Sequence, residues 1–85
     1  MDVDNIRIKN LERTAQVTSI EAKSIQMVVG EKNEFDIMDL QTYQRMKMRF
    51  NRLKSLTGMC FRCELRSNSI NVTRLEDEIN TATAN

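Results

Sequence analysis

The chain has 85 residues, of which 40% are hydrophobic, carries a net charge of +1 and contains neither histidine nor proline. A chain of this length forms one small domain that buries only roughly 60 to 65% of its unfolded surface, so we expect a protein partner or a homo-oligomer to support a thin core. Without histidine, a glycine-rich phosphate loop or a nucleophile motif, the sequence argues against an enzyme and against a small-molecule substrate.

The N-terminal residues MDVDN are acidic and lack the basic flank and apolar segment of a signal peptide. Apolar runs do not exceed three residues, as at Met27 to Val29, so a membrane-spanning segment is not expected. We therefore expect a protein that is not secreted by a signal peptide and that works in the cytoplasm or within an intracellularly assembled particle.

The first segment is predicted to form a long helix over about residues 4 to 29, either continuous or broken near residue 18, where TSIE matches a capping box. A turn signal is missing between Ile6 and Val29, and Gly30 suits the left-handed cap of such a helix. The competing prediction is strands, which the many β-branched residues from 17 to 29 support. The helical stripe consists of Ile8, Leu11, Ala15, Thr18, Ala22, Ile25 and Val29, widened by Val17, Ile20, Met27 and Val28.

The next residues, 30 to 38, are predicted to be a connecting loop whose Phe35, Ile37 and Met38 fold back under the domain. Asp39 is a good N-cap, and a second helix is expected over about residues 39 to 57, ending at Gly58. Its apolar stripe consists of Leu40, Tyr43, Met46, Phe50, Leu53 and Thr57.

After Gly58 the apolar period changes to two, which predicts a β-hairpin over about residues 59 to 75. Leu65 is expected to face Ile70, and Cys63 to face Val72, with either a two-residue turn at 67 and 68 or a longer loop from 66 to 69. Residues 76 to 85 have the acidic and polar composition of a tail. The predicted fold is therefore a single α+β domain over residues 1 to 75, built from two helices and a two-stranded antiparallel hairpin.

Cys60 and Cys63 are the only cysteines, and their C-x-x-C spacing allows three interpretations. In a strand they point to opposite faces, which favours two small, semi-apolar strand residues. A zinc ion would need two more thiolates, which only a second copy supplies, so zinc shared between two copies is the weaker alternative. A redox site is disfavoured because the cysteines follow the C-terminus of a helix, whose dipole opposes a thiolate.

The charges are unevenly spread along the chain. Residues 1 to 38 and 67 to 85 each have a net charge of −2, whereas residues 39 to 66 have a net charge of +5. This basic segment either pairs with the acidic segments or binds the phosphates of a nucleic acid, without any sign of base-specific readout. The candidate phosphate-binding residues are Arg45, Lys47, Arg49, Arg52, Lys54, Arg62 and Arg66.

Taken together, these patterns predict a non-catalytic structural or interaction protein that is a subunit of a larger assembly. The candidate interface residues are Ile8, Leu11 and Ile25 on the first helix and Met48, which falls among arginines on the second. Size and style are typical of compact accessory or particle proteins of viruses and phages, although that source rests on no particular residue. A small nucleic-acid-binding protein is the alternative.

Overall fold

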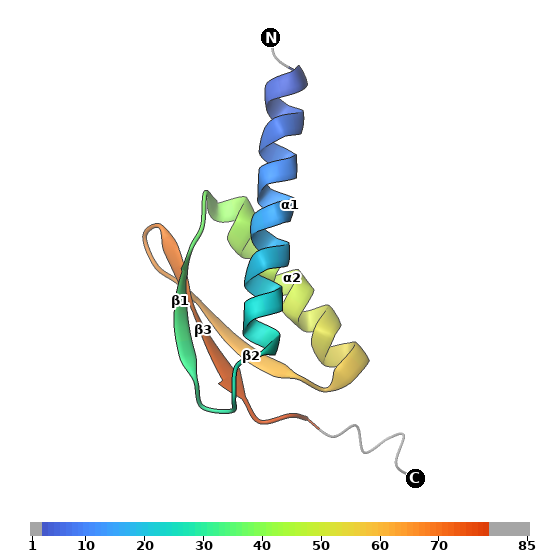
Figure 1. Cartoon of the computed structure of the whole chain (residues 1–85), viewed down its shortest axis with the longest axis vertical. Helices are drawn as coiled ribbons and strands as arrows, with labels where there is room; N and C mark the ends of the chain where they lie inside the picture. Colours follow the sequence, from blue (N-terminus) through green and yellow to red (C-terminus); the bar gives the residue numbers. More distant parts are fainter. Residues whose placement is uncertain (1–2, 79–85) are drawn as a thin grey trace.

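The structure, a computed structural model, describes residues 3 to 78 and has an α+β fold (Figure 1). Its elements are α1 (Val3–Ile25), β1 (Lys32–Asp36), α2 (Leu40–Thr57), β2 (Cys60–Leu65) and β3 (Ser69–Leu75). The strands form an antiparallel sheet in the order β1-β3-β2. Helix α2 packs against β2, and α1 packs against α2.

The third strand corrects the prediction of a two-stranded hairpin. Part of the segment expected to be a loop is β1, which pairs with the free side of β3 so that Phe35 lies opposite Ile70. Phe35 packs against the core and Ile37 is buried in it, as expected, but Met38 is exposed. The pairing with β3 makes β1 a strand, because its own sequence, KNEFD, offers one apolar residue and no alternation.

Helix α1 is continuous through residue 18, but it ends at Ile25 and not at Val29. The N–H of Met27 donates to the carbonyl of Ser24 at 3.0 Å, which tightens the end of the helix and turns Met27 into the core. Gly30 is therefore not the helix cap. It takes its left-handed φ of 92° in the turn before β1, where its N–H donates to the carbonyl of Arg74 at 2.8 Å.

Helix α2 and the hairpin agree with the sequence prediction. The side chain of Asp39 accepts from the N–H of Thr42, and Gly58 adopts the left-handed cap with its N–H on the carbonyl of Lys54. In the hairpin, Leu65 faces Ile70 and Cys63 faces Val72. Residues 66 to 68 separate β2 from β3, and the N–H of Arg66 donates to the carbonyl of Ser69 at 2.8 Å, which closes the shorter alternative, a two-residue turn at 67 and 68.

The core lies between the two helices and one face of the sheet. Because residues alternate between the faces of a strand, the neighbours of Ile70 and Val72 in β3 point to the opposite face, which carries mostly polar residues. The buried apolar side chains are Val17, Ile20, Met27, Ile37, Met46, Phe50, Ile70 and Val72. This small core leaves the N-terminal half of α1 without cover: residues 4 to 12 are all exposed, and this part of the helix extends beyond the rest of the domain (Figure 1).

Candidate interaction surface on the helical layer

Helix α1 has two stripes, and the core covers only one of them. Val17, Ile20 and Ser24 are buried. At 100° per residue, the longer apolar stripe predicted from the sequence lies on the other side of the helix, and every member of it within α1 is exposed. We call this set the outer stripe: Ile8, Leu11, Ala15, Thr18, Ala22 and Ile25. Of the residues that widen the predicted apolar stripe, Val17, Ile20 and Met27 thus face the core and Val28 is exposed, while the main stripe faces solvent.

Two contacts fix the point at which α1 leaves the domain. The guanidinium of Arg13 pairs with the carboxylate of Asp39 at 2.7 Å through both Nε and a terminal nitrogen. One turn further along, the Gln16 side-chain carbonyl accepts from the N–H of Met38 at 2.9 Å. The helix is therefore held to the start of α2 from residue 13 onward, and its first three turns project from that point.

Asp39 holds this junction together because it serves both helices. One oxygen accepts from the N–H of Thr42 at 3.0 Å and from its buried hydroxyl at 2.9 Å, and the other accepts from Arg13. Partial burial works against the charged carboxylate, but the hydrogen bonds from Arg13 and Thr42 outweigh it and hold the pKa of Asp39 below its ordinary value.

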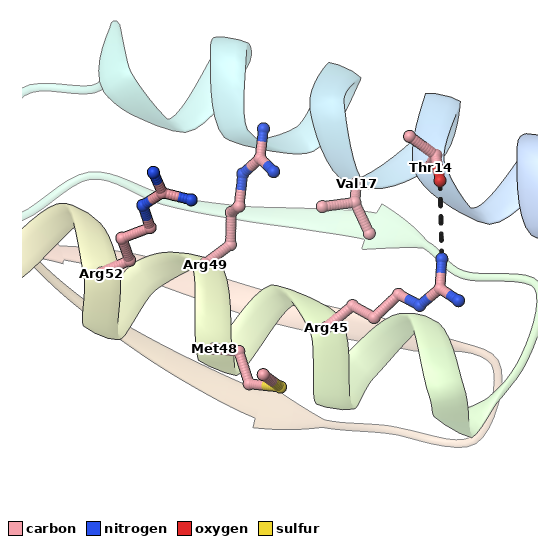
Figure 2. A pocket seen from close by; sticks show the side chains of 6 residues that line it. All are labelled: Thr14, Val17, Arg45, Met48, Arg49 and Arg52. Carbon is pink, nitrogen blue, oxygen red and sulfur yellow. Dashed lines mark hydrogen bonds between the residues drawn. The ribbon is translucent and has the colours of Figure 1, made fainter.

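A groove of about 400 Å³ runs between α1 and α2, lined by Thr14 and Val17 on one side and by Arg45, Met48, Arg49 and Arg52 on the other (Figure 2). Arg49 pairs with Glu21 of α1 through its Nε at 3.1 Å. Arg45 donates to Thr14 at 3.5 Å, the contact drawn in Figure 2, and to Asn10 at 3.3 Å. Two of the three arginines thus bind the neighbouring helix, and Arg52 has no partner among the described residues.

The other predicted phosphate-binding residues do not lie on this surface. Lys47 sits over the ring of Tyr43 at 5.4 Å, and Lys54 pairs with Glu78 at 3.1 Å, which raises the pKa of Lys54. Arg62 alternates with Cys63 in β2, so it points away from α2, to the open face of the sheet. Arg66 lies in the loop before β3. The seven basic residues are therefore spread over different faces of the molecule.

The two cysteines lie on opposite faces of β2. Cys63 is paired with Val72 and packs against the core, whereas Cys60 is paired with Leu75. Burial raises the pKa of the Cys63 thiol to about 11, and Lys47 offsets this only in part. One copy therefore cannot present both sulfur atoms to a single ion, and residues 3 to 78 contain no group of three or more potential metal ligands.

Four apolar residues predicted to form an interface are exposed: Ile8 by 51%, Leu11 by 64%, Ile25 by 43% and Met48 by 70%. The first three share the outer stripe, and Met48 borders the groove beside it. Ile6, Val28 and Leu56, which were not predicted to form an interface, are also exposed. Arg13 was missed because only the folded chain brings it to Asp39.

Comparisons with protein family models, with curated proteins and with solved structures give no match to this chain. Among the described residues, neither helix has the length and apolar character needed to cross a membrane.

Proposed function

We propose that this protein is a non-catalytic interaction protein, a subunit of an assembly that forms inside the cell, and that it binds another protein through the outer stripe of α1. The observation that supports the proposal is the exposure of that stripe along the whole helix. Contiguous exposed apolar surface is uncommon in monomeric proteins and marks interaction sites. A compact accessory or particle protein of a virus or phage is the kind of subunit that would use such a surface.

The fold of α1 supports the same proposal. Residues 4 to 12 of α1 are all exposed, and Asn10 meets α2 only through Arg45, so this part of the helix has little of the tertiary packing that provides most helical stability. The β-branched and polar residues of this helix have low intrinsic helix propensity, so propensity does not compensate for the missing packing. Docking against a partner would supply the missing contacts and bury Ile8 and Leu11 at the same time.

Site-specific photocrosslinking in the cells that make the protein tests this proposal. Benzoylphenylalanine in place of Leu11 is expected to link the protein to another polypeptide, of the same or a different kind. The same photoreactive residue in place of Arg62, which is exposed on the open face of the sheet, is the control and is expected to give no product. Absence of a product at Leu11, or equal yields at both positions, would refute the proposed function.

The second candidate function, nucleic-acid binding, is favoured by the row of Arg45, Arg49 and Arg52 along the groove (Figure 2). The contacts of Arg45 and Arg49 with α1 make these two less available to phosphate. Labelled duplex DNA and single-stranded RNA are the probes. If this function holds, binding at low salt should weaken steeply as salt rises and should be lost in Arg52→Glu but kept in Arg62→Glu. An affinity that does not depend on the salt concentration, or that falls equally in both variants, would argue against nucleic-acid binding.

A further inference from the structure

We propose that the occupant of the outer stripe is the α1 helix of a second copy of this chain, packed antiparallel so that Ile8 of one copy faces Ile25 of the other. This inference rests on the proposed function and names its partner. It is carried by three features of α1: the spacing of the stripe, the sizes of its side chains and the charges beside it.

The spacing is that of a helix pair and not of a helix lying on a sheet. Successive members of the outer stripe follow each other at steps of three, four, three, four and three residues. A mean step close to 3.5 residues keeps a seam facing one other helix over its whole length. The buried stripe on the opposite side of α1 already packs on the domain, so a second helix meets the outer stripe without displacing a contact.

The side-chain sizes favour the antiparallel arrangement. The exposed, projecting half of α1 carries the large Ile8 and Leu11, whereas the half within the domain carries the small Ala15, Thr18 and Ala22 before the large Ile25 at its end. Antiparallel packing places Leu11 against Ala22, and Ala15 against Thr18, each pair occurring twice by the two-fold symmetry. Leu11 then meets the small Ala22, and the small Ala15 and Thr18 at the centre let the two helices approach closely. A parallel pair would instead place Leu11 against Leu11 and Ala22 against Ala22, so that wide and narrow layers would alternate along the seam.

The flanking charges are complementary in the same arrangement. Glu12 and Lys23 lie on one flank of the outer stripe, both are exposed, and neither has an ion-pair partner among residues 3 to 78. In the antiparallel register Glu12 of one copy lies only about 3 Å along the axis from Lys23 of the other, at 1.5 Å per residue. The two Glu12 side chains are then more than about 13 Å apart by the same rise, so like charges do not meet. The opposed helix dipoles add to the preference.

In this arrangement the projecting half of α1 packs against the α1 helix of the other copy. Ile8 and Leu11 of each copy would lie on the part of α1 that the other copy holds against its own α2. Each domain thus covers the three turns that its partner leaves bare, and the two sheets lie on opposite outer sides of the helix pair.

Disulfide crosslinking tests the register directly. In a background in which Cys60 and Cys63 are both replaced by alanine, and which retains the circular dichroism spectrum of the native chain, three oxidised samples are compared: Ile8→Cys alone, Ile25→Cys alone, and a mixture of the two. In the antiparallel pair the two residues at position 8 are about 25 Å apart along the axis, whereas a disulfide needs Cα atoms within about 7 Å. We expect the mixture to yield the disulfide between positions 8 and 25, and each single variant to stay uncrosslinked.

Crosslinking of either single variant with itself would overturn the antiparallel register, and failure of the mixture to crosslink would overturn the pairing. Sedimentation equilibrium of the native chain supplies a second measurement. We expect Leu11→Glu to weaken dimerisation at least tenfold, because it places two unpaired carboxylates in the seam. The matched control is Leu40→Glu, a 54% exposed leucine in the first turn of α2, where an acidic residue is favourable and dimerisation should be unchanged.

A chain that stays monomeric at every concentration would overturn this inference but not the proposed function. In that case a photocrosslink from Leu11 to a different polypeptide would still support an interaction protein. Loss of that crosslink as well would refute both.

Discussion

Replacing Asp39 by alanine should destabilise the domain more than any other single exposed or half-exposed carboxylate, because three separate interactions end on its side chain. It caps α2 by accepting from the N–H of Thr42, it accepts from the fully buried hydroxyl of Thr42, and it pairs with two of the three guanidinium nitrogens of Arg13. Without the carboxylate, the Thr42 hydroxyl has lost its acceptor inside the protein, and α1 has lost its attachment to the start of α2.

The magnitude follows from these three terms. Loss of an N-cap costs about 1 kcal/mol. A hydrogen bond to a charged group is worth roughly 1.5 to 3 kcal/mol, and an unsatisfied buried hydroxyl costs about 1 kcal/mol more. Since the terms share one side chain they do not add fully, and we expect a loss of about 3 kcal/mol in the free energy of unfolding. Asp39→Asn keeps the cap and most of the hydroxyl contact, so it should lose about half as much.

Urea unfolding followed by circular dichroism measures these differences. Asp36→Ala, which removes an exposed carboxylate from the open face of the sheet, is the control and should change the free energy by less than about 0.5 kcal/mol. The pKa of Asp39 is lowered by folding, so its contribution is complete above its ordinary value of 3.8 and is lost as the pH falls through the lower value of the folded protein. A loss in Asp39→Ala no larger than that in Asp36→Ala, or one that does not shrink in acid, would refute this reasoning.

Two further predictions concern the segment after α2. Gly58→Ala should lower the free energy of unfolding by more than about 1 kcal/mol, because φ is 81° and the added Cβ would lie 2.7 Å from the carbonyl oxygen of Glu78. Gly30→Ala is the control: φ is 92° but the Cβ would enter open space, so only about 1 kcal/mol is lost to backbone strain. Equal melting temperatures for the two variants would contradict this prediction. Burial raises the pKa of Cys63 from 9.0 to about 11, so near pH 8 its thiol should react with iodoacetamide roughly 100-fold more slowly in the native protein than in urea. Peptide mass spectrometry measures both rates, with Cys60 as the internal reference. Similar rates in both states would place Cys63 outside the core.

Local signals in the sequence were sufficient to predict α2 and the hairpin. Asp39 and Gly58 bound α2 because a short polar side chain and a left-handed glycine satisfy the groups at its two ends, and both caps are read from adjacent residues. The period-two pattern set the register of Leu65 against Ile70, because a shift of one residue would expose every apolar side chain of the hairpin.

The third strand and the orientation of α1 could not be read in the same way. β1 is a strand because β3 offers it a free edge, which is a long-range property that the residues of KNEFD do not encode. Helix α1 has two apolar stripes, and nothing local says which of them meets the domain. The small core accommodates only Val17 and Ile20 from this helix, together with Met27 after it, so the stripe with more apolar members stays outside.

The central place of β3 in the sheet has a consequence for how the chain folds. β1 and β2 share no backbone pairing, and each pairs only with β3, the last in chain order of the strands within residues 3 to 78. β2 lies next to β3 along the chain, so this hairpin closes a short loop, whereas pairing β1 must close the whole segment from residue 37 to 68. We expect the hairpin to form first and β1 to join it later. A nascent chain that ends before residue 69 can form both helices, but it cannot form any part of the sheet.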